Sequence, residues 1–154
     1  KPGKWMITLK KILALSLVAT AAWLAHVLFT ITTMPALEEG WAKLEPAAIE
    51  KYVAEGKTVF VDVTADWCLT CKANKKFVLE QPEIEAALAA PNVVRMQGDW
   101  TQRDEATAAY LQSFGRYGIP FNVVYGPAAP QGIPLPELLA KKDIMDALAT
   151  VGGE

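Results

Sequence analysis

Cys68 and Cys71 are the only two cysteines in the sequence and the residues best suited to chemistry. A Cys-x-x-Cys pair is typical of a zinc site, of c-type haem attachment or of a redox-active dithiol. Structural zinc needs four ligands and no other cysteine is present, while haem attachment needs a histidine where this sequence has Lys72. A redox-active dithiol therefore fits best. A purely structural disulfide stays open, although closing so short a loop would stabilise the fold little.

The residues around the pair predict how such a dithiol would work. The β-branched run Thr58–Thr64 predicts a buried strand, and we expect a helix from Cys68 to about Glu80. The first N–H groups of a helix lack internal partners and would stabilise a thiolate at Cys68 by about 0.3–1 kcal/mol. We therefore expect Cys68 to attack a substrate disulfide. Cys71, one turn later and less exposed, would resolve the mixed disulfide.

Asp62 is a second candidate, because a carboxylate inside an apolar strand is costly unless it is paired or protonated. Two interpretations are open. Asp62 is either a polar residue turned to water at a strand edge, or a buried acid with a raised pKa that accepts the proton of Cys71.

The Ile119-Pro120 pair is the third candidate, after a break at Gly115–Gly118. Pro120 is either the first residue of a strand or part of a cis peptide bond. In the second case, the backbone of Ile119 would lie beside Cys68 and pair with an extended substrate segment.

Hydrophobic periodicity predicts an α/β domain in which helices and strands alternate around a partly parallel sheet with an antiparallel end. Proline- and glycine-rich residues 126–136 predict a loop that leads into a last edge strand. The expected helices are Pro46–Ala54, Cys68–Glu80, a short one from Pro82, Arg103–Phe114 and one over residues 144–151, and the expected strands are Thr58–Thr64, Val93–Gln97, Phe121–Tyr125 and Ile133–Leu139.

An apolar run precedes this domain. Residues 12–33 carry no Asp, Glu, Lys or Arg and predict a transmembrane helix, since about 20 residues span a bilayer core of about 30 Å. The basic flank, residues 1–11, is expected in the cytoplasm, residues 34–43 form a linker, and residues 44–154 form the domain on the far side. A cleavable signal peptide is the alternative. Because the sequence begins at Lys1, we expect a processed product or a piece of a longer polypeptide.

The charge of the domain argues against one class of partner, and the single histidine has two possible interpretations. All 17 acidic residues lie from Glu38 onward, so the domain is acidic and we expect no nucleic-acid partner. His26, the single histidine, lies within the apolar run. It is either a proton relay or cofactor ligand, or a neutral imidazole near the outer interface or packed against a neighbouring helix.

Asp62, the core Trp67-Cys68-x-x-Cys71-Lys72 and Ile119-Pro120 together resemble the thioredoxin superfamily, over roughly residues 44–151. The form Ala65–Lys72, with Leu-Thr in place of the Gly-Pro of cytosolic thioredoxins, is similar to one branch. That branch is the C-terminal periplasmic domain of the DsbD family of thiol:disulfide interchange proteins, including its ScsB-like copper-tolerance relatives.

The resemblance implies a thioredoxin-like fold and an electron relay in the bacterial inner membrane, with the catalytic domain in the periplasm. A transmembrane reductase domain would reduce Cys68 and Cys71, which would then reduce disulfides of periplasmic proteins. Asp62 would be the buried acid, and Trp67 would contact substrate together with Ile119 and the cis-proline Pro120. No metal is expected, and no cofactor besides the redox-active Cys68–Cys71 disulfide. Lys75 departs from the family, because DsbD-like domains can carry an acid there.

Two other functions remain open. One is an anchored thioredoxin-like protein that reduces the haem-binding cysteines of apocytochromes during cytochrome c maturation. The other is a copper-binding or interaction module that uses Cys68 and Cys71 as soft ligands.

Overall fold

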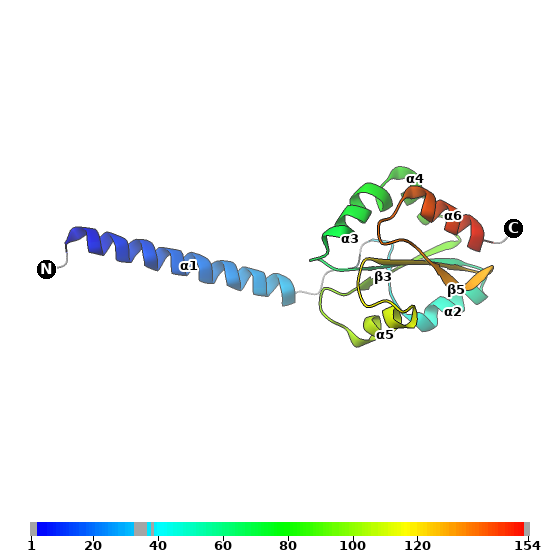
Figure 1. Ribbon diagram of the computed structural model, residues 1–154, viewed down its shortest axis with the longest axis horizontal. Helices are drawn as coiled ribbons and strands as arrows, with labels where there is room; N and C mark the ends of the chain where they lie inside the picture. Colours follow the sequence, from blue (N-terminus) through cyan, green and yellow to red (C-terminus); the bar gives the residue numbers. More distant parts are fainter. Residues whose placement is uncertain (1–2, 33–36, 38, 153–154) are drawn as a thin grey trace. The chain divides into compact units, whose positions relative to one another are not determined.

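A computed structural model describes residues 3–32, 37 and 39–152, and the chain divides into two units, Lys1–Ala36 and Leu37–Glu154. The first unit is helix α1, Lys4–Thr32 (Figure 1). Its segment Trp5–Phe29, with a mean hydropathy of 2.1, is long and apolar enough to cross a membrane by length and composition. The helix thus begins within the predicted basic flank. His26 is exposed on it.

The predicted linker is only partly described, since residues 34–36 and 38 lie outside the described residues, as does residue 33 of the predicted span. The last two linker residues form a strand, β1, Ala42–Lys43. This strand pairs in parallel with β3, so the sheet begins before the predicted domain boundary at residue 44.

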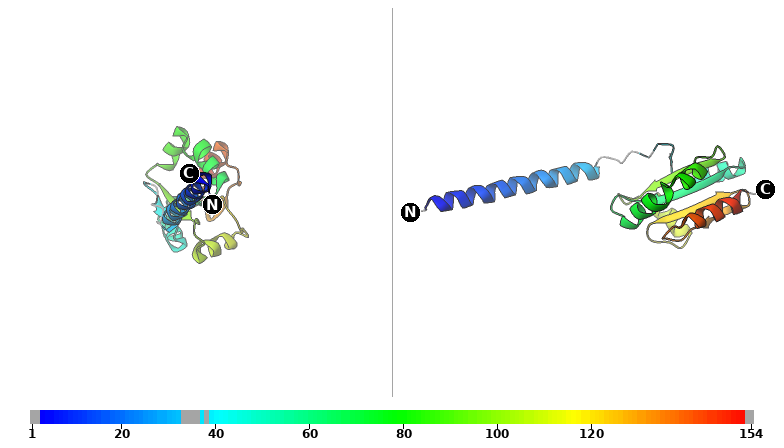
Figure 2. Two further views of the ribbon diagram at one scale, coloured as in Figure 1. Left: turned by 90° about the vertical axis from the view of Figure 1, so that its left-hand side faces the viewer. Right: turned by 90° about the horizontal axis from the view of Figure 1, so that it is seen from above.

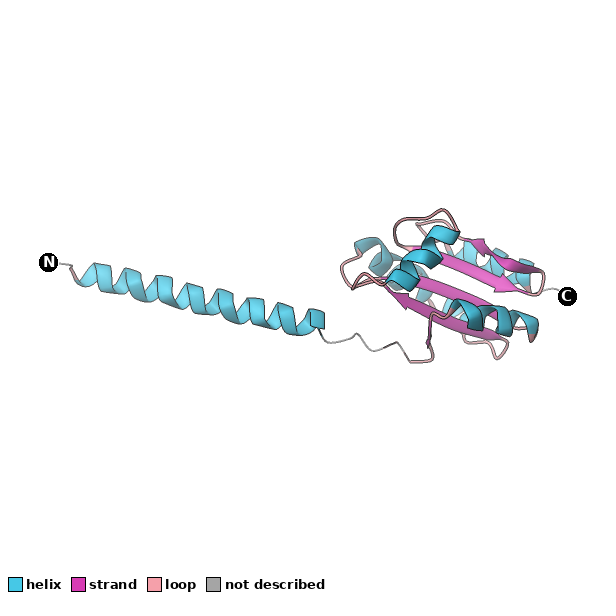
Figure 3. Ribbon diagram, turned by 90° about the horizontal axis from the view of Figure 1, so that it is seen from below, coloured by secondary structure: helices cyan, strands magenta, loops and turns pink. Residues whose placement is uncertain are grey.

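The second unit is a five-stranded mixed sheet in the order β1-β3-β2-β4-β5 (Figures 2 and 3). Strands β1, β3 and β2 run parallel, and β4 and β5 are antiparallel to their neighbours. The predicted mixed sheet with an antiparallel end is therefore confirmed. The other strands are β2 (Thr58–Thr64), β3 (Val93–Asp99), β4 (Phe121–Gly126) and β5 (Ala129–Pro134), and the helices are α2 (Pro46–Ala54), α3 (Leu69–Asn74), the π-helix η1 (Lys75–Leu79), α4 (Pro82–Leu88), α5 (Glu105–Ser113) and α6 (Lys141–Val151).

Strand β2 is the centre of the sheet and is covered on both faces, as its continuous apolar run predicts. Val59, Val61 and Val63 pack with side chains of α2 and α5. Phe60 points the other way and packs with η1, α4 and α6. Alternation along the strand places Asp62 on the same face as Phe60.

Two predicted elements need correction. The edge strand is β5, Ala129–Pro134, and the prediction of Ile133–Leu139 was wrong because proline and glycine in residues 126–136 indicated a loop. An edge strand tolerates proline, since one side of its backbone has no ladder partner. The helix after Cys68 is also not one α-helix: the N–H of Glu80 donates to the carbonyl of Lys75 at 2.9 Å, which closes a π-turn.

Candidate functional site

Cys68 and Cys71 form a disulfide with an S–S distance of 2.05 Å. Cys68 is the N-cap of α3, and its sulfur accepts a hydrogen bond from the backbone N–H of Cys71 at 3.1 Å. The pair therefore occupies the helix start that its sequence predicts. The exposed fractions of the two cysteines, 6% and 5%, hardly differ, so the expected difference in accessibility is nearly absent in the oxidised form.

Ile119 and Pro120 lie at this site although they are about fifty residues away in the sequence. Ile119 packs against the cluster of Ala65, Cys68 and Cys71, and the Ile119–Pro120 peptide bond is cis. Of the two interpretations of Pro120, the structure therefore has the cis bond. Pro120 itself is buried just before β4, which begins at Phe121.

The turn before Cys68 is held by the loop that follows β3. The backbone N–H of Asp66 donates to the hydroxyl of Thr101 at 2.9 Å, and the indole N–H of Trp67 donates to the carbonyl of Thr101 at 3.3 Å. The N–H of Thr101 in turn donates to the Asp99 carboxylate at 2.8 Å. Trp67 is thus anchored at its polar atom while 60% of the residue stays exposed beside the disulfide. Sequence reasoning did not find Thr101.

Asp62 is buried in the central strand, with 8% of the residue exposed. The side-chain amide of Asn122, its direct neighbour on β4, donates to Asp62 Oδ1 at 2.8 Å. This hydrogen bond offsets part of the cost of burying the carboxylate. The interpretation of Asp62 as a polar residue at a strand edge was therefore wrong. Asn122 is a partner that the sequence did not reveal.

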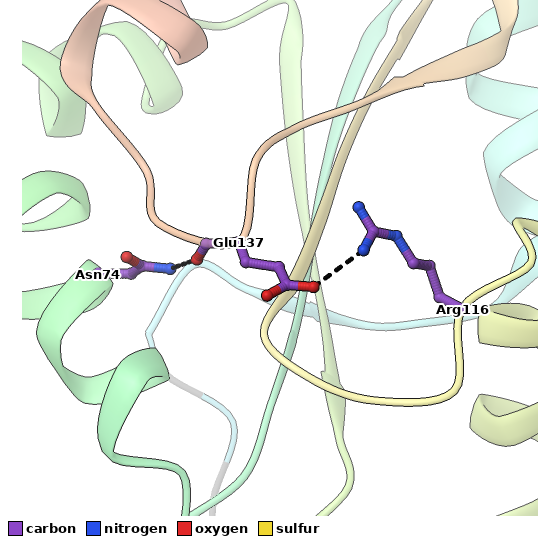
Figure 4. A network of polar contacts seen from close by, with 3 residues as sticks. All are labelled: Asn74, Arg116 and Glu137. Atoms are coloured by element: carbon purple, nitrogen blue, oxygen red, sulfur yellow. Dashed lines mark hydrogen bonds and ion pairs between the residues drawn. The ribbon is translucent and has the colours of Figure 1, made fainter.

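Asn74, one turn after Cys71, ties the active-site helix to the segment between β5 and α6 (Figure 4). Its side-chain amide donates to the carbonyl of Glu137 at 2.7 Å, and its oxygen accepts from the N–H of Leu139 at 3.1 Å. The Glu137 carboxylate receives a hydrogen bond from Arg116 at 2.9 Å. Arg116 belongs to the loop that leads to Pro120. One network thus connects three segments around the disulfide.

The segments described above also carry exposed apolar side chains. Trp67 and Leu69 flank Cys68, Tyr117 precedes Ile119, and Leu138 lies between the two residues that Asn74 holds. The arrangement can present an oxidised or reduced cysteine pair to the extended chain of another protein.

The chain is similar in sequence to known proteins. A family profile described as Thioredoxin-like matches residues 41–127. The thiol:disulfide interchange protein DsbD of Cronobacter sakazakii is 32% identical over 111 residues, which cover 71% of this chain and 17% of that protein. DsbD of Escherichia coli K12 is 35% identical over 78 residues, which cover 51% of this chain and 13% of that protein. The matched region is thus a small part of these curated relatives.

Solved structures of related proteins have a similar fold. The oxidised C-terminal domain of Neisseria meningitidis DsbD has a TM-score of 0.53 and 29% identity, covering 68% of this chain and 90% of that one. A thioredoxin from Thermus thermophilus has a TM-score of 0.56 and 22% identity, covering 76% of this chain and 92% of that one, and shows the shared fold. The chain belongs to the thioredoxin-like family, and its domain matches the C-terminal domain of DsbD.

Proposed function

We propose that this chain is a membrane-tethered thiol:disulfide oxidoreductase that reduces disulfides of periplasmic partner proteins through Cys68 and Cys71. The observation that carries the proposal is the Cys68–Cys71 disulfide at the start of α3, packed against Ile119 next to a cis-proline. The relatives named thiol:disulfide interchange proteins support the same chemistry.

The reaction begins with the reduced pair. The Cys68 thiolate attacks one sulfur of the partner's disulfide, so that a mixed disulfide forms and the partner's other sulfur leaves as a thiolate. The N–H of Cys71, which points at the Cys68 sulfur at 3.1 Å in the oxidised form, favours the negative charge on Cys68 before the attack.

Cys71 completes the exchange. Its thiol gives a proton to the Asp62 carboxylate, and the resulting thiolate attacks the sulfur of Cys68. The mixed disulfide breaks, the Cys68–Cys71 disulfide forms, and the partner leaves with two electrons and two reduced cysteines. Asp62 is suited to this role because it is buried on the sheet face that η1 covers, where bulk water does not compete for the proton.

Substrate would be held beside Cys68 by backbone and apolar contacts. Ile119, which packs against the cluster of Ala65, Cys68 and Cys71, offers its backbone to an extended segment of the partner. Trp67 offers an exposed ring that its hydrogen bond to Thr101 holds in one place.

Electrons for the next cycle would come from a transmembrane reductase domain, which returns Cys68 and Cys71 to the dithiol by a second exchange. The apolar helix α1 supports a membrane tether, and the lysines before and within its first turns support a cytoplasmic N-terminal end. A dithiol in an oxidising compartment needs such a supply of electrons, because it is otherwise oxidised after one turnover.

Replacing Cys71 with Ser tests the function. The variant should accumulate mixed disulfides between Cys68 and partner proteins in cells, because the resolving thiol is missing, and a Cys68→Ser control should trap none. Mass spectrometry of the trapped proteins identifies donor and acceptors, and recovery of apocytochromes would favour a role in cytochrome c maturation. Equal trapping by both variants, or a reduction potential near the value of about −120 mV of a strong oxidant, would contradict the proposal.

A further inference from the structure

A pocket of about 70 Å³ opens beside Asp62, on the sheet face that η1 and α4 cover. Its walls carry three acidic side chains, Asp62, Glu80 and Glu85, and two basic ones, Lys75 and Arg95. Burial would favour the neutral form of Asp62, because the carboxylate is removed from water. A cation that faces Asp62 therefore decides whether the buried carboxylate keeps its charge.

Arg95 lines the same pocket but also has a contact of its own. Its guanidinium lies over the ring of Trp41, 5.7 Å from the ring centroid, and Trp41 packs against Phe60. In the pairing of β2 with β3, Arg95 lies opposite Phe60, whereas Asp62 lies opposite Gln97. Arg95 thus lies on β3 two residues before the residue that pairs with Asp62.

Lys75, the first residue of η1, also lines the pocket. It lies four residues after the buried Cys71, so both side chains fall on the helix face that is turned toward the sheet. The residue is partly buried. The other two acids of the pocket compete little for it: Glu80 lies 3.9 Å from the Lys76 ammonium, and Glu85 is exposed and screened by solvent.

We propose that Lys75 is a positioning residue that keeps Asp62 in its ionised, proton-accepting form. The inference rests on the proposed function, since an ionised Asp62 matters to catalysis as the acceptor of the Cys71 proton. Asn122 donates to the same carboxylate from β4 and acts in the same direction.

The test is a titration of Asp62 itself in the full chain in detergent micelles. Carboxyl-labelled aspartate is followed by carbon NMR as a function of pH in the reduced protein, and an Asp62→Asn variant assigns the signal. Lys75→Met should raise the pKa of Asp62 by about one unit or more, because it removes an opposite charge from the surroundings of a buried carboxylate. Lys75→Arg should restore the original titration.

Lys76→Met is the matched control, because the Lys76 side chain is 76% exposed and adjacent in sequence. It should leave the Asp62 titration unchanged. An unchanged titration in Lys75→Met, or an equal shift in Lys76→Met, would overturn the inference. Because the titration is read at the carboxyl carbon, it separates this result from a failure of the dithiol to reduce partners. If both proposals hold, the pH profile of insulin reduction shifts upward in Lys75→Met and returns in Lys75→Arg.

Discussion

Replacing Asn74 with Ala should destabilise the domain far more than an exposed polar substitution does. Asn74 is 5% exposed and uses both ends of its amide to hold the segment before α6. Alanine keeps the helix but removes both hydrogen bonds, so the effect isolates the connection between the active-site helix and that segment.

The expected loss of stability comes from two backbone groups that lose their hydrogen-bond partner. The N–H of Leu139, a residue that is 8% exposed, loses its acceptor in the interior, which costs about 1–3 kcal/mol. The carbonyl of Glu137 belongs to an exposed residue and can bind water, so losing its donor costs about 0.5–1.5 kcal/mol. Together, Asn74→Ala should lower the free energy of unfolding by about 1.5–4.5 kcal/mol.

Urea unfolding followed by tryptophan fluorescence measures this loss in the oxidised protein, with the slope m unchanged. Arg116→Ala is the control within the same network. This substitution breaks the ion pair between Arg116 and Glu137, whose side chains are 40% and 68% exposed, respectively. Because the pair is exposed, its loss should lower the free energy of unfolding by at most about 1 kcal/mol. A loss below about 1 kcal/mol for Asn74→Ala, or one equal to that of Arg116→Ala, would refute the reasoning.

Two further predictions concern a buried tyrosine pair and a glycine of β5. The hydroxyls of Tyr110 and Tyr125 lie 2.6 Å apart, and burial raises the pKa of both, that of Tyr125 to about 12. The contribution of these neutral phenols to the free energy of unfolding is therefore complete below about pH 10 and is lost as pH rises toward 12. An absorbance titration of the folded protein measures the ionisation of the two phenols. Ionisation at about pH 10 would contradict the prediction. Gly132→Ala, at φ +82° with its new Cβ 2.6 Å from Val123, should cost about 1–3 kcal/mol in urea unfolding. Gly56→Ala, at φ +81° with open space, should cost less.

The elements that could be predicted depend on local chemistry. Helix α2 has the predicted bounds because Pro46 suits a first helical turn and a glycine follows its end. Strand β2 has the predicted bounds because its β-branched residues pack well on a covered sheet. Helix α5 begins two residues later than predicted, since Asp104 is its N-cap and accepts hydrogen bonds from Thr107 that lower the pKa of its carboxyl.

Other elements form because they pair with a strand that is distant in the sequence, and their own residues do not predict this pairing. Strand β1 has two residues and exists because Ala42 and Lys43 pair with β3. Strand β5 contains two prolines and a glycine, and it forms because it needs one ladder partner, β4. The change from α3 to η1 at Lys75 likewise has no local signal in the sequence.

Three features follow from the sequence alone: Cys68 and Cys71 are the reactive pair, a covered strand precedes them, and an apolar helix comes first. These features depend on residue type and spacing over short distances. Three others are visible only in the folded chain: the cis Ile119–Pro120 bond, the hydrogen bond from Asn122 to Asp62, and the hydrogen bonds of Asn74 to the segment before α6. The reason is that buried polar groups take whichever partner the fold brings near, here 60 or more residues away, and the sequence does not show which segments will meet.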